Sequence, residues 1–157
     1  MKKIIASLLV LLCVFSVACG EEAAKQKVLS VTVDELLEVL TTSNAEGEMY
    51  SYNSSRLADN IGISEDLYSA GKFFIPVESA GVETIAFFTA TSEENAEKIK
   101  ASLEGYISRI KNEQENYSAS NFEVAKSAVA VKEGLNVYLI MSPSKDALIS
   151  LINTYLK

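Results

Sequence analysis

The chain has 157 residues, with 21 acidic and 14 basic side chains, two cysteines, and neither histidine nor tryptophan. Because it has no histidine, the chain cannot form a serine–histidine–aspartate triad, an imidazole general base or any histidine-ligated zinc or haem site. Two cysteines are too few for a thiolate-only metal site, and the length is that of one domain. We therefore expect one acidic domain that holds no metal or other cofactor.

The first 18 residues have the layout of an export signal. Lys2 and Lys3 form a short basic start, and the stretch 4–18 contains only two polar residues, both serine. This stretch is shorter than the roughly 20 apolar residues that a membrane-spanning helix needs. It also runs directly into Gly20-Glu21-Glu22. We predict a signal peptide over residues 1–18, and a retained anchor helix is the less favoured interpretation.

The end of this segment, Ser16-Val17-Ala18-Cys19-Gly20, is similar to the lipobox of bacterial lipoproteins. Ser16 replaces the usual leucine, while Ala18 is the expected small residue. The similarity implies cleavage after Ala18 and diacylation of Cys19. Ordinary secretory cleavage, which would leave Cys19 as a free thiol, is the alternative. Because two fatty chains anchor a protein stably, we expect Cys19 to hold the protein in the lipid bilayer, at the outer face of the cytoplasmic membrane.

Removal of residues 1–18 would take away Cys13 and two lysines but no acid. The remaining domain would be more acidic than the whole chain and, once Cys19 is acylated, would have no thiol for a disulfide or a nucleophile. Nucleic acid is not an expected partner, since Arg56 and Arg109 are the only arginines. The acidity fits a solvated surface better than an acidic recognition patch.

We interpret residues 19–30 as the lipidated cysteine and a flexible tether, followed by a single domain over residues 31–157. Thr32 and Glu35 have the spacing of a capping box and predict a helix start. The stretch 43–71 gives little pattern beyond a short helix near residues 55–60, ended by glycine.

Two hairpins are predicted at 73–90 and 128–141, each with a glycine in its turn, and Pro76 places the first strand near a sheet edge. Between them, apolar residues from Ala96 to Tyr117 recur at threes and fours, and Thr91 with Glu94 predicts a helix start. We expect this long helix to pack on the domain's own sheet rather than in a coiled coil.

A final helix is expected to open at Ser142, with Pro143 in its first turn. The order of elements predicts an α+β fold. It has an antiparallel sheet of about four strands in two hairpins, a long helix between the hairpins, and helices mostly on one face.

Patterns typical of catalysis are few. Residues 142–145 fit the S-x-x-K pattern of penicillin-binding enzymes and residues 51–53 fit their S-x-N pattern, but the order is reversed and no K-T-G triplet occurs. A helix cap and a polar loop are therefore favoured at these positions. Glu93, Glu94 and Glu97 fit the first turn of a helix better than a glycosidase pair, because the helix dipole favours acids there.

Arg109, Tyr50 and Tyr52 are the candidate contacts for a ligand or partner. Arg109 could clamp a carboxylate or phosphate, but a surface ion pair with a nearby glutamate is favoured. The two tyrosines belong to an apolar set that either lines a groove or forms a small satellite core under a loop, and we favour the core. The set is Met49, Tyr50, Tyr52, Leu57 and Ile61.

Several features follow one another in a definite order along the chain. They are the lipobox, residues 58–63, residues 83–88, a helix with Arg109, Gln114 and Tyr117, and a strand over 134–142. This order resembles that of small lipoproteins of Clostridia-type Firmicutes that carry domain of unknown function 4358. The resemblance covers most of residues 30–157. It implies an extracytoplasmic, membrane-tethered domain and no established activity.

We expect a non-enzymatic binding or assembly role at the cell envelope, because the sequence offers no concentrated reactive cluster. The partner would be another envelope protein or a glycopolymer. The alternative is an enzyme, or an accessory subunit, acting on envelope glycopolymers. A transporter-type substrate receptor is less favoured, since such receptors generally need two lobes.

Replacement of Cys19 by alanine tests the lipid anchor. Cys19→Ala removes the acylated sulfur, so we expect loss of labelling by a fatty-acid probe and release of the protein from the membrane fraction. The wild-type chain, labelled in parallel, is the control. A Cys19→Ala protein that stays fully membrane-bound would contradict the lipoprotein interpretation.

Overall fold

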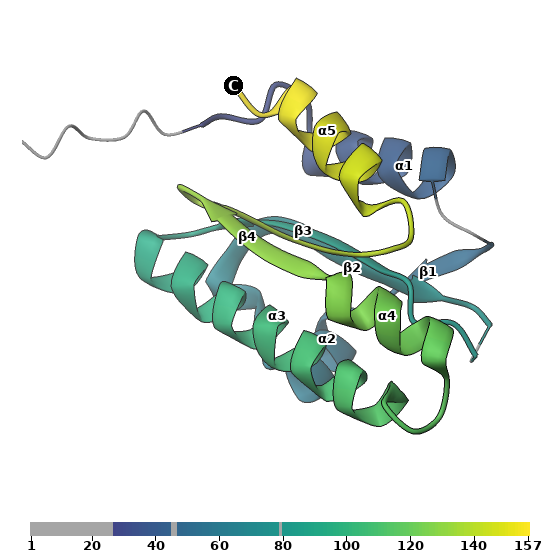
Figure 1. Ribbon diagram of the computed structural model, residues 1–157. Coiled ribbons are helices and arrows are strands. Elements are labelled where there is room, and N and C mark those ends of the chain that lie inside the picture. The colour runs from purple at the N-terminus through teal and green to yellow at the C-terminus, as the bar shows by residue number, and fades with distance from the viewer. Residues whose placement is uncertain (1–26, 45–46, 79) are drawn as a thin grey trace, which may run out of the picture.

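The computed structural model describes residues 27–44, 47–78 and 80–157. Its strands are β1 (Met49–Ser51), β2 (Tyr68–Pro76), β3 (Thr84–Ala90), β4 (Val129–Glu133) and β5 (Asn136–Met141). Its helices are α1 (Val33–Asn44), α2 (Ser54–Ile61), α3 (Glu93–Gln114), α4 (Ala119–Ser127) and α5 (Lys145–Tyr155), with a 3-10 turn, η1, at Glu65–Leu67. The strands form one antiparallel sheet in the order β1-β2-β3-β5-β4 (Figure 1).

The predicted fold class is confirmed: helices and an antiparallel sheet form an α+β domain, with the long helix α3 between the β2–β3 and β4–β5 hairpins. The sheet has a fifth strand, because β1 arises from the stretch that gave little pattern. The strand with Pro76 was expected near a sheet edge. It is the second strand, because β1 pairs with it, Met49 opposite Pro76, and is itself the edge strand. Pro76 is the last residue of β2, and the next amide, that of Val77, donates to the Glu48 carbonyl at 2.8 Å.

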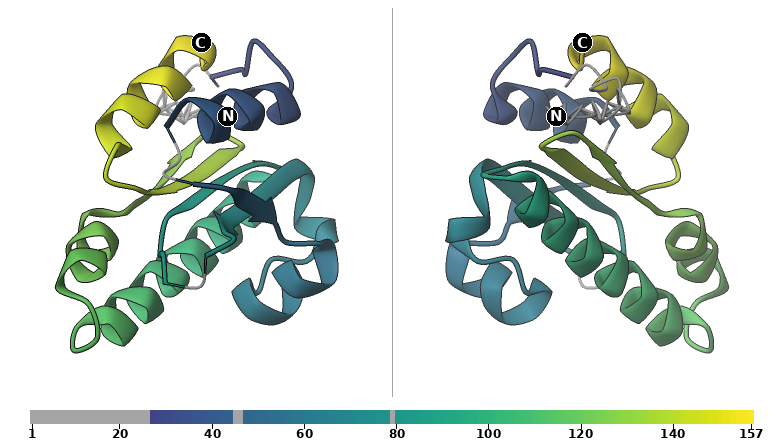
Figure 2. Two further views of the ribbon diagram at one scale, coloured as in Figure 1. Left: turned by 90° about the vertical axis from the view of Figure 1, so that its right-hand side faces the viewer. Right: turned by 90° about the vertical axis from the view of Figure 1, so that its left-hand side faces the viewer.

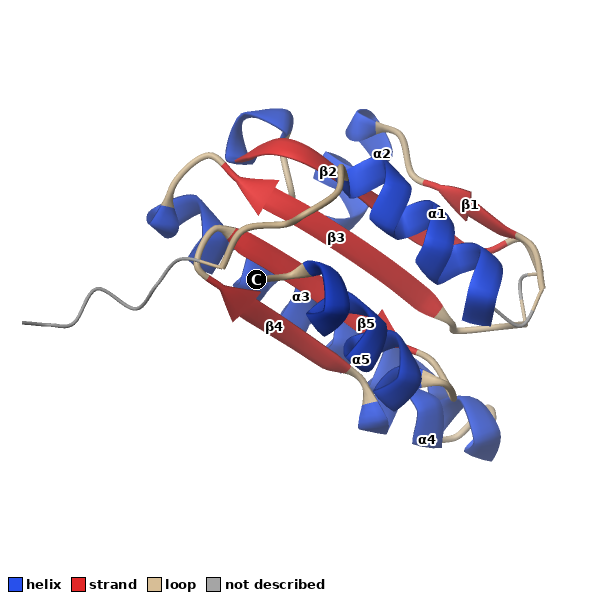
Figure 3. Ribbon diagram, turned by 90° about the horizontal axis from the view of Figure 1, so that it is seen from above, coloured by secondary structure: helices blue, strands red, loops and turns tan. Residues whose placement is uncertain are grey.

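The helices cover both faces of the sheet rather than mostly one. In Figures 1 and 3, α1 and α5 lie on one side, and Figure 1 shows α2, α3 and α4 on the other. The reason lies in the two central strands, β3 and β5, where every residue except Thr89 is buried. Successive strand side chains point to opposite faces, so a strand buried along its whole length needs a cover on each side.

Two separate apolar clusters fill these layers. Ala86 and Phe88 of β3 face α2, α3 and α4, where they pack with residues such as Leu103. Ile85 and Phe87 face the opposite way and pack with residues such as Leu36 of α1 and Ile152 of α5. Figure 2 shows the two helical layers on either side of the sheet, viewed from its ends.

The predicted export signal over residues 1–18, with Ala18 and Cys19 at its end, lies outside the described residues. Residues 27–30, which the sequence assigned to the tether, belong to the folded domain. The Val28 amide donates to the Lys157 carbonyl at 2.6 Å, and the Lys157 amide donates back to Val28 at 3.0 Å. The chain therefore enters the domain beside its own C-terminus.

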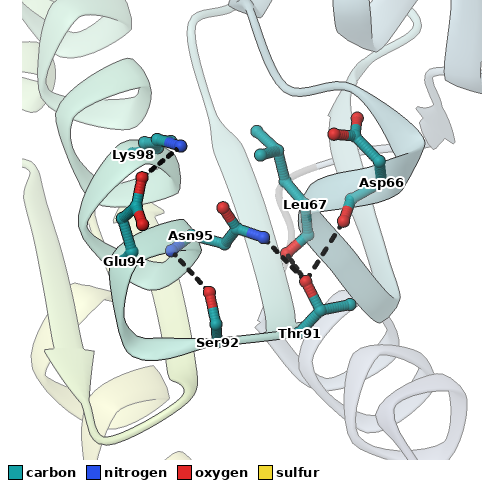
Figure 4. Close-up of polar contacts among 7 residues, drawn as sticks. All are labelled: Asp66, Leu67, Thr91, Ser92, Glu94, Asn95 and Lys98. Atoms are coloured by element: carbon teal, nitrogen blue, oxygen red, sulfur yellow. Dashed lines mark hydrogen bonds and ion pairs between the residues drawn. The ribbon is translucent and has the colours of Figure 1, made fainter.

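The N-terminus of α3 differs by one residue from the expected capping box. Ser92, not Thr91, is the N-cap: its hydroxyl accepts from the Asn95 amide at 3.1 Å (Figure 4). Thr91 instead donates to the Asp66 carbonyl at 3.1 Å and accepts from the Asn95 side chain at 2.8 Å. Thr91 therefore ties the 3-10 turn η1 to the start of α3.

At the ends of the other helices, some predictions are confirmed and others are wrong. The Thr32–Glu35 capping box is present, with both reciprocal backbone bonds, and α2 ends at Gly62 in the left-handed conformation. The long helix stops at Gln114, because Ser118 caps the separate helix α4, which leaves Tyr117 79% exposed instead of in the apolar stripe. The last helix starts at Lys145, later than Ser142.

Gly71 of β2 gives a test of this packing. A Cβ at this position would clash with the Phe88 ring and lie 2.9 Å from the Phe87 carbonyl oxygen. We expect Gly71→Ala to lower the free energy of unfolding by about 1–3 kcal/mol through overpacking. Urea unfolding followed by circular dichroism measures it.

Gly105 of α3 is the matched control, since nothing lies within 4 Å of a Cβ built there. Gly105→Ala should raise stability by roughly 0.5–1 kcal/mol, because alanine favours the helix. A Gly71→Ala protein as stable as the wild type would show that the Phe88 ring is not confined as described.

Candidate functional site

A groove of about 330 Å³ opens at the end of the sheet where β2 turns into β3. One wall is Tyr50 of β1 with residues 75–78 and 81–82, and the other is formed by Tyr106, Ile110, Glu113 and Gln114 of α3. A smaller hollow of about 120 Å³ adjoins it, sharing Pro76, Glu78, Gly81 and Val82 and reaching Asn121 of α4 and Pro143. We call the two together the β2–β3 groove.

Aromatic rings form a continuous series behind and along this groove. Tyr50 lies 6.1 Å from Tyr52, Tyr52 stacks on Phe73 at 5.6 Å, and Phe73 meets the edge of Tyr106 at 5.0 Å, all between ring centroids. Such pairs add roughly 0.5–1.5 kcal/mol each beyond buried area. The series fixes Tyr106, which is nearly buried, between the sheet and α3.

The hydroxyl of Tyr106 lies 3.1 Å from the hydroxyl of Thr84, at the start of β3. Burial of the ring raises the pKa of Tyr106, and the Thr84 hydrogen bond opposes this shift. The neutral phenol is therefore the stable form at the pH of most environments. Tyr106 acts here as a rigid wall of the groove, not as a base.

The three candidate contact residues from the sequence are brought into one neighbourhood, but only Tyr50 lines the groove. Tyr52 is half-buried behind it. The Arg109 guanidinium lies 5.2 Å from the centre of the Tyr106 ring, 3.7 Å from a Glu113 carboxylate oxygen and 3.5 Å from the Asn60 carbonyl. Arg109 thus makes the surface ion pair that was favoured, and it also joins α3 to α2.

The apolar set around Tyr50 divides between the two interpretations. Leu57 and Ile61 are buried in the core beneath α3, as the satellite-core interpretation predicted. Met49 packs against the cluster on the opposite face of the sheet. Tyr50, 38% exposed, is the member that lines a groove.

Sequence reasoning missed Glu78, Glu113 and Asn121 as groove residues. Glu78 and Glu113 are exposed carboxylates on opposite walls. The Asn121 side chain donates to the Ala80 carbonyl at 2.7 Å and to the Gln114 side chain at 3.3 Å, and so connects the β2–β3 loop to α3 and α4. The one available signal was Glu113, which interrupts the apolar repeat of the long helix.

The S-x-x-K pattern does not form a reactive pair. The Ser142 hydroxyl is buried, donates to the Glu83 carboxylate at 2.5 Å and accepts from the Ser144 amide at 3.0 Å. The Lys145 ammonium instead donates to the Ser127 carbonyl at 3.1 Å. A nucleophilic serine needs a base and access to a substrate, and Ser142 here is a buried structural group.

The acids at the start of α3 are held in surface ion pairs. Lys132 of β4 contacts Glu93 at 2.7 Å and Glu97 at 3.2 Å, while Glu94 pairs with Lys98 at 2.7 Å. Among the described residues, no group of three or more metal-binding side chains comes together.

A larger and more apolar cavity, of about 450 Å³, lies at the opposite end of the sheet beside residues 27–33. Asn136 lines this cavity: its side-chain nitrogen donates to the Lys27 carbonyl at 2.9 Å, and its side-chain oxygen accepts from the Thr89 hydroxyl at 3.2 Å. These bonds fix the position at which the chain enters the domain, so this end of the sheet has a structural role.

The fold and the groove define a class: a small α+β domain with an acidic, aromatic-lined groove at one sheet end. The chain belongs to the family described as Domain of unknown function (DUF4358), whose model matches residues 42–142. Comparisons with curated proteins and with solved structures gave no match. In the part of the chain that the structure describes, no helix is long and apolar enough to cross a membrane.

The family match covers one hollow more completely than the other. Every residue that lines the 330 Å³ groove falls within residues 42–142, whereas six of the eleven residues that line the larger cavity precede the match. The 330 Å³ groove is therefore the hollow that the family match covers in full.

Tyr106→Phe tests the wall of the groove. Loss of the Thr84 contact should lower the free energy of unfolding by about 0.5–1.5 kcal/mol at neutral pH. Because the folded pKa of Tyr106 is raised above its ordinary value of 10.0, its contribution is complete below pH 10 and is lost as the pH rises through the folded value. The variant should therefore lose less stability than the wild type above pH 10.

Urea unfolding at neutral and alkaline pH checks both parts. Tyr117→Phe is the matched control, since Tyr117 is 79% exposed and should change neither quantity. Equal alkaline losses in wild type and Tyr106→Phe would contradict the buried phenol.

Proposed function

We propose that this protein is a membrane-anchored extracytoplasmic lipoprotein that binds another envelope component in the β2–β3 groove, without catalysing a reaction. The observation that carries the proposal is the position of the groove relative to the point where the chain enters the domain. The groove is at the β2–β3 connection, and the entry point is beside Asn136 at the start of β5. Figure 1 shows the β2–β3 and β4–β5 connections at opposite ends of the central strands.

The length of β3 gives the distance between the groove and the entry point. This strand runs from Thr84, beside the groove, to Ala90 and the neighbouring Asn136, which holds Lys27 at the entry point. Seven residues at about 3.3 Å each span roughly 20 Å. A lipid on Cys19 lies only eight positions before Lys27. Such an anchor would hold the entry end near the bilayer and leave the groove directed away from it.

The polar groups around the groove favour binding over chemistry. Glu83 and Ser142 are bonded to each other in the interior, Tyr106 is held by Thr84, and Asn121 holds the loop. These bonds stiffen the groove but present no activated nucleophile or paired acid and base. The enzyme alternative has less support for this reason.

Site-directed photo-crosslinking in cells of the source organism tests the proposal. A photoreactive side chain at Tyr50 or Val77, which line the groove, should form adducts with a macromolecule of the envelope in intact cells. Val28 is the matched control, since it is exposed to a similar degree as Val77, 67% against 53%, but lies at the entry end.

The expected result is a discrete adduct from Tyr50 or Val77 that is absent from Val28. Adducts of the same kind and yield from all three positions, or none from the groove positions, would contradict a binding site in the groove.

A further inference from the structure

We propose that the occupant of the β2–β3 groove is a basic, extended segment of another polypeptide chain, which pairs with strand β1 as an additional edge strand. This inference rests on the proposed function and adds the chemical class of the partner. It is carried by the charge of the groove, by its exposed apolar side chains and by the open edge of β1.

The groove has charge of one sign only. Its charged lining residues are Glu78, Glu83 and Glu113, and no lysine or arginine lines it. Glu83 is buried with Ser142, so the exposed carboxylates are Glu78 on the loop and Glu113 on α3, and Glu113 also has its ion pair with Arg109 at 3.7 Å. Opposite charges across an interface steer association and discriminate against wrong partners. A lysine- or arginine-bearing segment is complementary, and an anionic polymer is repelled.

Exposed apolar side chains gather at the same end of the domain. Within the described residues, four large hydrophobic side chains are exposed, and two of them, Tyr50 and Val77, line the groove. A third, Tyr117, follows the C-terminus of α3. Tyrosine and aliphatic side chains beside charges are typical of surfaces that contact proteins.

The backbone of β1 supplies a reason for an extended partner. The Tyr52 amide donates to the Phe73 carbonyl at 2.9 Å, and the Glu48 carbonyl accepts from Val77, so residues 48, 50 and 52 turn their backbone groups toward β2. In an antiparallel strand the intervening residues, Met49 and Ser51, turn theirs the other way. In the described part of the chain, no strand pairs with that outer edge. An added strand there would run beside Tyr50 and the groove.

The opposite edge of the sheet is less suited to this pairing. Strand β4 carries Lys132 and Glu133, and Lys132 is held by Glu93 and Glu97. Charged side chains on an edge strand discourage pairing with another chain. Strand β1, Met-Tyr-Ser, has no charge and no proline, and its shortness limits the partner to a short paired segment.

The experiment uses the full chain in a neutral detergent and a fluorescently labelled peptide that alternates lysine and valine, read by anisotropy. We expect binding that weakens as salt is raised. The double variant Glu78→Gln/Glu113→Gln should weaken it roughly fivefold. Ser51→Pro, which removes one outward amide of β1, should weaken it by a similar factor.

Each variant has a matched control. Glu104 lies on α3 like Glu113, is equally exposed (52% and 51%) and has its own i,i+4 partner, so Glu104→Gln should bind as the wild type does. Ser51→Ala keeps the amide and should also bind normally. If Ser51→Pro disturbs folding, the Glu78→Gln/Glu113→Gln variant still tests the proposal.

Preferred binding of a glutamate–valine peptide or of an N-acetylglucosamine oligomer would overturn the inference. Self-association of the chain that Ser51→Pro abolishes would also overturn it, by making a second copy the occupant. Binding of no probe at all would do the same. In each case the crosslinking at Tyr50 and Val77 still decides separately whether the groove binds an envelope component.

Discussion

The architecture depends on the burial of β3 and β5 on both of their faces. Phe87 stacks on Tyr138 with ring centroids 6.0 Å apart on the side of α1 and α5, while Phe88 packs on the side of α3. Each buried side chain of this size contributes roughly 1.5–3 kcal/mol. Neither helical layer is therefore dispensable. The family match, residues 42–142, includes the sheet but almost none of α1 and none of α5, so that region alone would expose the Phe87 face.

Much of the fold follows from local signals in the sequence. The Thr32–Glu35 spacing, the glycine after α2, the two hairpins and the apolar repeat of α3 all act over a few residues. All four were predicted correctly, except that the repeat was extended to Tyr117, beyond the end of α3 at Gln114. The two-sided cover was not predicted, although the apolar runs of β3 and β5 are typical of strands buried on both faces. Strand β1 was missed because three residues are too few to show an alternating pattern, and because its pairing with residues 74–76 depends on the tertiary structure.

The site was less predictable, and for a physical reason. Tyr50, Glu78 and Glu113 come from a short strand, a loop and a helix, and nothing in their sequence spacing says that they meet. Only the register of β1 on β2 and the packing of α3 on Phe73 bring them together. Arg109 drew attention as a rare cation, yet its surroundings on α3 and α2 occupy it. The rarity of arginine was therefore a weaker indication of the site than the meeting of Tyr50, Glu78 and Glu113 in the fold.

The adjacent chain ends have a mechanical consequence. Residues 28 and 157 are bonded to each other at one end of the sheet, and the β2–β3 groove is at the other. A pull between the N-terminal segment and a molecule held in the groove would act nearly along the strands. Interstrand hydrogen bonds lie across that direction, so many of them would share the load at once, as in shear, instead of opening one after another. If the N-terminal segment is anchored as proposed, the domain is therefore oriented to resist extension along that axis.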